Sequence, residues 1–363
     1  MKMTDGRGLV SGEYQNTNHP IDREVWLHEC FPNWGSFLNQ QIESYEVPKG
    51  QVAMWWITGA TWILKTDEGA ILWIDPFAGS SGYTELASCG VCRQSGADTM
   101  NWLLCDPNVI DPWEFNRLDA CLITHVHQDH CDIYAVKAAL QTTSAPFYGP
   151  ETVDKRLKEF EVPDERRNCV HIGDTIEVPG AIIQVLPNYD ETATRTGGGP
   201  LLDYDVCAVS YLIKTSAGNI LFAADSWYND GYAYFPDFFD IDVATCNMGY
   251  NYPGATDKMT PYDLCRFADA IRCKVIIPDH YENLAHCAYD PNMLIGQFER
   301  LADELIPDIH HCIMQIGGMY QYPRDINMKR YRHKAGFGNI DKTRVRNYQR
   351  LAKVFEPKQA ILR

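Results

Sequence analysis

Short apolar runs separated by turn-forming residues are the most regular pattern in this 363-residue chain. Three such runs, at 52–57, 61–65 and 70–75, lie close together early in the sequence. Gly59 and the turn at 67–69 separate them, and this spacing is typical of neighbouring strands joined by tight turns. The pattern therefore predicts that the fold begins with a β-meander.

Later segments combine the same strand pattern with apolar residues at helical spacing. Helices are predicted over 21–46, with an interruption at Pro32, and over 133–142 and 261–272. Further strands are predicted at 118–124, 172–178, 182–186, 209–214, 219–224, 243–246 and 274–278. Two β-rich halves, each followed by a helix, favour an α+β protein built as a sandwich with helices on its outer faces. We expect a loose polar arm at 1–20 and one domain over 21–363.

Histidines gather at one point of this pattern. His125, His127, Asp129 and His130 form an HxHxDH cluster directly after the apolar run 118–124. Imidazole nitrogens and carboxylate oxygens are common ligands of zinc, manganese and iron. The cluster predicts a metal centre on the loop after a strand, and the alternative is a chance grouping of histidines.

Three other apolar runs also end in groups that can bind metal. The run 219–224 precedes Asp225, and the run 274–278 leads to His280. A third run, 183–187, is followed by Asn188 and Asp190, either of which could supply one more ligand. Each of these residues could instead be an ordinary turn or capping residue, but the nearby HxHxDH cluster favours the metal.

These residues fall into two sets, each of which could bind one ion. His125 and His127 would bind one ion, Asp129, His130 and His280 would bind the other, and Asp225 would bridge or cap them. Such a centre polarises a carbonyl or phosphoryl group and activates water. We therefore predict catalytic roles for Asp129, Asp225 and His280. If only one ion binds, Asp129 becomes available as a general base.

Composition narrows the classes of function. The net charge of −16 argues against a protein that binds the phosphate backbone of nucleic acids. The chain has no apolar run of transmembrane length, and its first residues do not resemble a signal peptide, so we expect a cytoplasmic protein without a membrane partner. The 13 cysteines are scattered and favour reduced thiols, and Cys89 and Cys92 are a weak redox or zinc signal.

Several motifs together resemble the L-ascorbate-6-phosphate lactonase family of the metallo-β-lactamase superfamily. HxHxDH points only to the superfamily, whereas the combination of motifs is more specific. The resemblance covers about 21–325 and rests on FPNWGS at 31–36, AMWW at 53–56, THVHQDH at 124–130, Asp225-Ser226 followed by Tyr228, TDKM at 256–259 and QIGG at 315–318.

The resemblance implies an αββα sandwich, a homo-oligomer and a lactonase that needs one or two divalent ions. Manganese is the expected ion, with zinc or iron as alternatives. The implied reaction opens L-ascorbate 6-phosphate to 3-keto-L-gulonate 6-phosphate, a step of L-ascorbate degradation. This family also lacks the superfamily histidine near 186–190, and Asp190 is carried over as a ligand or a group behind the ligands. The chain departs from the family around Tyr252 and Tyr281.

A phosphorylated substrate requires a cationic partner. Lys258, within the TDKM motif, and Arg195 are the candidates, and each could instead be a solvated or structural charge. Three other functions stay open: a phosphodiesterase or nuclease, a thioester or amide hydrolase, and a non-enzymatic binding or regulatory protein on a hydrolase fold.

Overall fold

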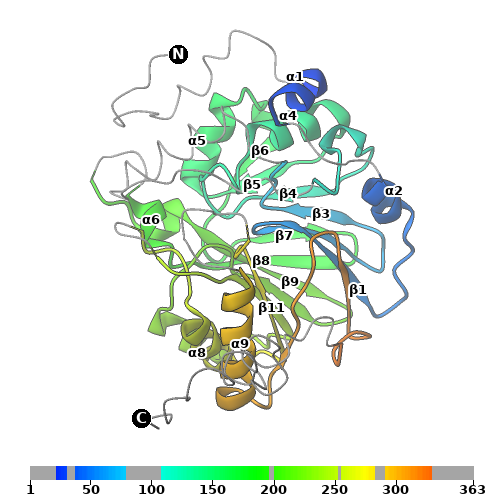
Figure 1. Ribbon diagram of the computed structural model, residues 1–363. Helices are drawn as coiled ribbons and strands as arrows, with labels where there is room; N and C mark the ends of the chain where they lie inside the picture. Colours follow the sequence, from blue (N-terminus) through cyan, green and yellow to red (C-terminus); the bar gives the residue numbers. More distant parts are fainter. Residues whose placement is uncertain are drawn as a thin grey trace, which may run out of the picture.

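Two β-sheets packed face to face form the centre of the computed structural model (Figure 1). The structure describes residues 22–30, 37–78, 108–195, 200–251, 255–282 and 291–328. Within these residues, each sheet has seven strands. Helices lie on the outer face of each sheet, so the layers follow the order helix, sheet, sheet, helix.

The first sheet has the strand order β14-β1-β2-β3-β4-β5-β6. Its strands are β1 (Val52–Thr58), β2 (Thr61–Lys65), β3 (Ile71–Ile74), β4 (Ala120–Leu122), β5 (Phe147–Gly149), β6 (Arg167–Cys169) and β14 (Met319–Tyr322). The strands from β14 to β3 pair antiparallel, and those from β3 to β6 pair parallel.

The second sheet has the order β13-β12-β11-β10-β9-β8-β7. Its strands are β7 (Thr175–Val178), β8 (Ala181–Pro187), β9 (Val209–Thr215), β10 (Asn219–Phe222), β11 (Val243–Asn247), β12 (Val275–Asp279) and β13 (His310–His311). It repeats the plan of the first sheet, because β7 to β10 pair antiparallel and β10 to β13 pair parallel.

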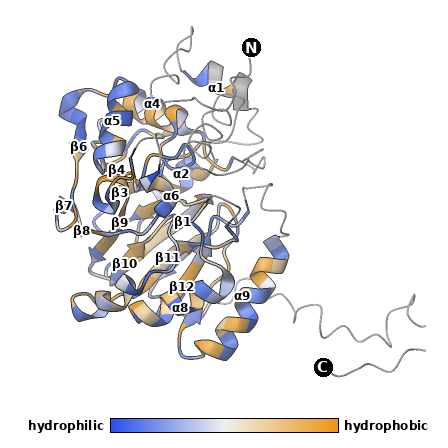
Figure 2. Ribbon diagram, turned by 90° about the vertical axis from the view of Figure 1, so that its left-hand side faces the viewer, coloured by the Kyte–Doolittle hydropathy of each residue, from blue (hydrophilic) through white to orange (hydrophobic). Residues whose placement is uncertain are grey.

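Helices and short helical turns surround the two sheets. They are α1 (Arg23–Cys30), α2 (Phe37–Ser44), α4 (Ile133–Thr142), α5 (Glu151–Glu159), α6 (Glu191–Thr194), α7 (Tyr204–Cys207), α8 (Pro261–Ile271) and α9 (Pro291–Leu305), with 3-10 turns η2 (Pro112–Glu114), η3 (Asp164–Arg166) and η4 (Asp230–Asp237). Residues of α1, α4 and α5 pack on the first sheet, and residues of α8 and α9 pack on the second. Figure 2 shows that α8 and α9 carry both hydrophobic and hydrophilic residues, as expected for helices that cover a sheet. None of the helices in the described residues is long and apolar enough to cross a membrane.

Strand β1 shows how the sequence produces these layers. All seven of its residues are buried. Trp55 belongs to the core beneath the outer helices, whereas Met54 and Trp56 belong to the core between the sheets. Successive side chains of a strand point to opposite faces, so a strand covered on both faces is apolar throughout.

The predicted αββα sandwich is confirmed, together with the β-meander and the helices at 133–142 and 261–272. One arrangement differs from the prediction of two successive halves. Strand β14, near the end of the described chain, returns to the first sheet and pairs with β1 through Val52 and Tyr322. The arm at 1–20, the motif at 31–36 and the pair Cys89 and Cys92 lie outside the described residues.

Candidate metal centre

The predicted ligands come together where strands of both sheets end. The loop after β4 carries the HxHxDH cluster, and Asp190, Asp225 and His280 follow β8, β10 and β12. Two of these strand ends turn through the left-handed region of backbone space, at Ala224 with φ 51° and at His280 with φ 54°. Such conformations are uncommon outside glycine and concentrate at functional sites.

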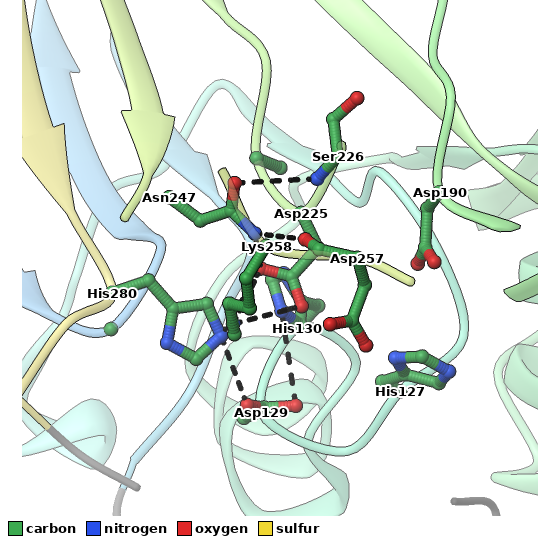
Figure 3. Close-up of polar contacts among 12 residues, drawn as sticks. His127, Asp129, His130, Asp190, Asp225, Ser226, Asn247, Asp257, Lys258 and His280 are labelled. Carbon is green, nitrogen blue, oxygen red and sulfur yellow. Dashed lines mark hydrogen bonds and ion pairs between the residues drawn. The ribbon is translucent and has the colours of Figure 1, made fainter. Parts of the chain in front are cut away.

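Seven residues predicted as ligands lie in one buried cluster (Figure 3). Their donor atoms form overlapping groups in which all atoms lie within 4.8 Å of one another. The groups are His125, His127 and Asp190; His125, His130 and Asp225; Asp129, His130 and His280; and His127, Asp225 and Asp257. The first and third groups correspond to the two predicted ion-binding sets, which we call the first and second halves of the centre. Asp225 links these two halves.

In the first half, two imidazoles converge on a carboxylate. His125 Nε2 lies 2.9 Å from His127 Nδ1 and 3.6 Å from Asp190 Oδ2. The other oxygen, Asp190 Oδ1, accepts a hydrogen bond from Ala193 N and caps α6. Asp190 Oδ2 is buried without a hydrogen-bond partner among the described residues, and a metal ion would satisfy it.

In the second half, two more imidazoles face two carboxylates. His280 Nε2 lies 3.2 Å from Asp129 Oδ2 and 3.3 Å from Asp225 Oδ1. His130 Nε2 lies 3.6 Å from Asp225 Oδ2 and 3.8 Å from Asp129 Oδ1. Asp225 therefore faces the histidines of this half while it also belongs to the group that contains His127.

The charges of the cluster fit a divalent ion. Burial lowers the pKa of His127 from 6.5 to about 4, so its imidazole is neutral at pH 7, as metal binding requires. Burial and the charges of Asp257 and Asp225 raise the pKa of Asp190 well above its usual range. Several carboxylates packed together without water repel one another, and a bound cation relieves that repulsion.

Asp75, at the end of β3, orients His130 directly and His125 through Thr124, on the side of each ring that faces away from the cluster. Its Oδ2 accepts hydrogen bonds from Thr124 Oγ1 at 2.7 Å and from His130 Nδ1 at 2.8 Å. Thr124 Oγ1 in turn lies 3.1 Å from His125 Nδ1. This leaves the Nε2 atoms of His125 and His130 directed at the cluster, a common arrangement behind metal ligands. Sequence reasoning missed Asp75, although it too is an acid that ends an apolar run.

Comparison with known proteins agrees with this geometry. Residues 74–281 match the family model described as a beta-lactamase superfamily domain. The chain is 35% identical over 333 residues to the probable L-ascorbate-6-phosphate lactonases UlaG of Salmonella newport and Salmonella heidelberg, covering 87% of this chain and 94% of each relative. The chain belongs to the L-ascorbate-6-phosphate lactonase family. It is therefore a metal-dependent hydrolase of the beta-lactamase superfamily.

Solved structures support the fold of this family member. The isothiocyanate hydrolase from Delia radicum gut bacteria aligns with a TM-score of 0.55 at 18% identity, covering 74% of this chain and 98% of that one. Igni18, a metallo hydrolase from Ignicoccus hospitalis, aligns with a TM-score of 0.52 at 16% identity, covering 75% of this chain and 98% of that one. At these identities the likeness concerns the fold alone.

The two predicted phosphate-binding residues of this lactonase family member occupy different surroundings. Lys258 is buried, and its Nζ donates to Asp225 Oδ1 at 3.0 Å and Oδ2 at 3.2 Å. Arg195 follows α6, is about one-third exposed and pairs with Glu191. The structure therefore places Lys258 inside the metal centre, while Arg195 pairs at its edge with a residue of α6.

Asp257 is a second residue that sequence reasoning missed. It precedes Lys258 in the TDKM motif, is buried, and has a carboxylate oxygen close to donors of His127 and Asp225. Burial and the charge of Asp225 raise its pKa to about 6. The only sequence signal was an acid beside the lysine of a family motif, in a segment without a strand pattern.

Proposed function

We propose that this protein hydrolyses a phosphorylated sugar-acid lactone, with L-ascorbate 6-phosphate as the first candidate and 3-keto-L-gulonate 6-phosphate as its product. The single observation that carries the proposal is the buried cluster of four histidines and four aspartates at the strand ends, in a member of this family. The similar Salmonella proteins are described as probable L-ascorbate-6-phosphate lactonases, and that description supplies the candidate substrate.

The residues of the cluster have distinct proposed tasks. His125, His127 and Asp190 would hold one divalent ion, and Asp129, His130 and His280 a second, with Asp225 between them. The bound ions would supply Lewis acidity toward the lactone carbonyl and lower the pKa of water. If only one ion binds, the Asp129 carboxylate is available to accept a proton from the attacking water. We expect manganese, with zinc or iron as alternatives.

Lys258 and Arg195 are the proposed partners of the substrate phosphate. The Lys258 ammonium is buried beside Asp225, so a phosphate that reached it would gain a charge-assisted hydrogen bond shielded from water. Arg195 is more accessible and could contact the phosphate from the rim of the site. We further propose that the protein acts in the cytoplasm as a homo-oligomer.

Metal analysis combined with a substrate panel tests this function. The purified protein should contain a first-row divalent ion, lose activity when chelated and regain it with manganese. It should prefer the phosphorylated lactone over the free sugar lactone by roughly ten- to a hundredfold, because each charge-assisted hydrogen bond contributes about 1.5–3 kcal/mol. The panel should include phosphodiesters and thioesters.

Three substitutions test which residues the activity and the preference for phosphate require. His125→Ala and Asp225→Ala should abolish turnover by removing donors, and Lys258→Ala should erase most of the preference for phosphate. Full activity after thorough chelation would contradict the metal-dependent mechanism. Equal turnover of the two lactones would remove the phosphate from the proposal, and faster turnover of a phosphodiester or thioester would replace the substrate class.

A further inference from the structure

The TDKM segment is fastened to the metal centre by hydrogen bonds along its backbone. Asn251 Oδ1 accepts from the backbone N–H groups of both Asp257 and Lys258 at 2.9 Å. Thr256 N donates to Thr192 Oγ1 at 2.8 Å, and Thr256 O accepts from Glu191 N at 3.1 Å. These contacts hold the segment against α6, the short helix that Asp190 caps.

The side-chain amide of Asn247 connects Asp257 to Asp225, the residue that links the two halves of the centre. Asn247 Nδ2 donates to Asp225 Oδ1 at 2.9 Å and also to the backbone oxygen of Asp257. The main chain of Asp257 and the side chain of Asp225 are therefore fixed to the same group. A main chain held this firmly beside metal-binding atoms places the Asp257 carboxylate where it could bind a metal.

The Asp257 side chain points into the cluster. Figure 3 shows it beside Asp225, on the same side as His127 and Asp190 and on the opposite side from Asp129 and His280. Its donor oxygen lies within 4.8 Å of donors of His127 and Asp225. Asp257 is only 5% exposed, and its Oδ1 atom has no hydrogen-bond partner among the described residues. A buried carboxylate oxygen without a partner requires a cation or a donor.

We propose that Asp257 is a direct metal ligand in the half of the centre that contains His127. This half then combines two histidines with the carboxylates of Asp190, Asp225 and Asp257. A set so rich in oxygen favours harder ions such as Mn²⁺ over soft ions. This ligand assignment rests on the metal centre of the proposed function and adds a residue to it, but it does not depend on which substrate is hydrolysed.

A different role for Asp257 would be to balance the charge of Lys258 and hold the loop. Both roles predict that its loss lowers the stability of the metal-loaded protein, so that stability alone cannot separate them. Ligation alone predicts that changing the donor atom changes which metal binds. Asp257→Cys replaces a hard oxygen with a soft thiolate at the same place and is therefore the decisive variant.

The experiment measures metal binding without any substrate. Metal-free full-length wild type, Asp257→Asn and Asp257→Cys are titrated with Mn²⁺ and Cd²⁺ in competition with a chromophoric chelator. We expect Asp257→Asn to weaken Mn²⁺ binding at one site by about tenfold or more. In Asp257→Cys, the ratio of Cd²⁺ to Mn²⁺ affinity should rise by at least about tenfold, and loading with Co²⁺ should produce a thiolate charge-transfer band that wild type lacks.

Two controls keep the result interpretable. Asp242→Asn removes a buried carboxylate far from the centre and should leave both affinities unchanged, and thermal unfolding confirms that each variant is folded. Unchanged Mn²⁺ binding in Asp257→Asn, or an unchanged Cd²⁺ to Mn²⁺ ratio without a charge-transfer band in Asp257→Cys, would overturn the assignment. Failure to hydrolyse lactones would leave these binding results unaffected, so the two proposals fail separately.

Discussion

At the residue scale, the orientation of the proposed ligands depends on the carboxylate of Asp75, which lies on their side away from the cluster. Asp75 accepts from Thr124 N, Thr124 Oγ1 and His130 Nδ1, all at 2.7–2.8 Å. It is fully buried and has a positive φ of 46°. A residue in this uncommon conformation, with three donors around it, fixes which nitrogen of His130 faces the candidate metal centre.

Asp75→Asn should weaken metal binding while it preserves the size of the side chain. The amide brings two N–H donors into a site where every neighbour is already a donor, so His130 loses its partner or turns. We expect the dissociation constant for Mn²⁺ to rise by about 10- to 100-fold, as measured by competition with a chelator.

Asp119→Asn is the matched control for this change. Asp119 accepts from Ile71 N at 2.8 Å, at the opposite end of the β3–β4 pair. Its substitution should lower stability slightly and leave metal affinity unchanged. If both variants bind Mn²⁺ as wild type does, Asp75 has no role in orienting His130.

At the element scale, the turn between β1 and β2 holds the end of β12. Gly59, with φ 51°, accepts from His280 N at 3.2 Å and donates its own N–H to Glu282 Oε1 at 2.5 Å. Trp62 Nε1, from β2, donates to Asp279 Oδ2 at 2.7 Å. The first sheet thereby holds His280, a proposed ligand that the second sheet supplies, and glycine suits the close, left-handed turn.

Trp62→Phe should separate this hydrogen bond from ordinary packing. It leaves Asp279 Oδ2 buried without its donor, which costs about 1–3 kcal/mol. Trp55→Phe is the control, because Trp55 is equally buried but its Nε1 has no hydrogen-bond partner among the described residues. Urea unfolding of metal-free protein should show the larger loss in Trp62→Phe, with weaker Mn²⁺ binding in that variant only. Equal losses would mean that the Trp62–Asp279 bond does not contribute.

Elements with local signals could be predicted from the sequence, and those that depend on distant pairing could not. The run before His125 and the run before Asp225 both end in polar groups, and the structure brings those ends together. Strand β14 was not predicted, because only its partner β1, far away in the chain, makes it a strand. Asp257 was missed for a similar reason, since Asn247 and Asn251 position it and nothing in its own segment does.

At the scale of the whole molecule, polar contacts join the two sheets at the end away from the metal centre. Asp242, directly before β11 in the second sheet, accepts from Tyr322 OH of β14 in the first sheet at 2.9 Å. It also accepts from Lys274 Nζ at 2.7 Å and from Asn219 N at 2.7 Å. One ionised carboxylate thus joins β10, β12 and β14 around the start of β11.

This junction should make stability depend on pH. Burial opposes the charge of Asp242, but the hydrogen bonds from Lys274, Asn219 and Tyr322 outweigh it and lower its pKa below the ordinary 3.8. A carboxyl whose pKa is lower in the folded protein than in the unfolded chain stabilises the fold at every pH above the unfolded value. That contribution decreases as pH falls below the pKa of the unfolded chain and is lost once the pH passes the folded pKa.

Asp242→Asn removes this titration and tests the junction directly. At neutral pH the variant should be less stable than wild type by about 1–3 kcal/mol, because Tyr322, Asn219 and Lys274 all lose a charged acceptor. Urea unfolding at a series of pH values should show this difference shrinking as pH falls through and below the ordinary carboxyl pKa, because wild-type Asp242 itself becomes protonated there. Comparing the two proteins at each pH cancels the titration of every other carboxylate, including those of the metal centre. A difference that stays constant over this range would show that the charge of Asp242 does not stabilise the contact between the sheets.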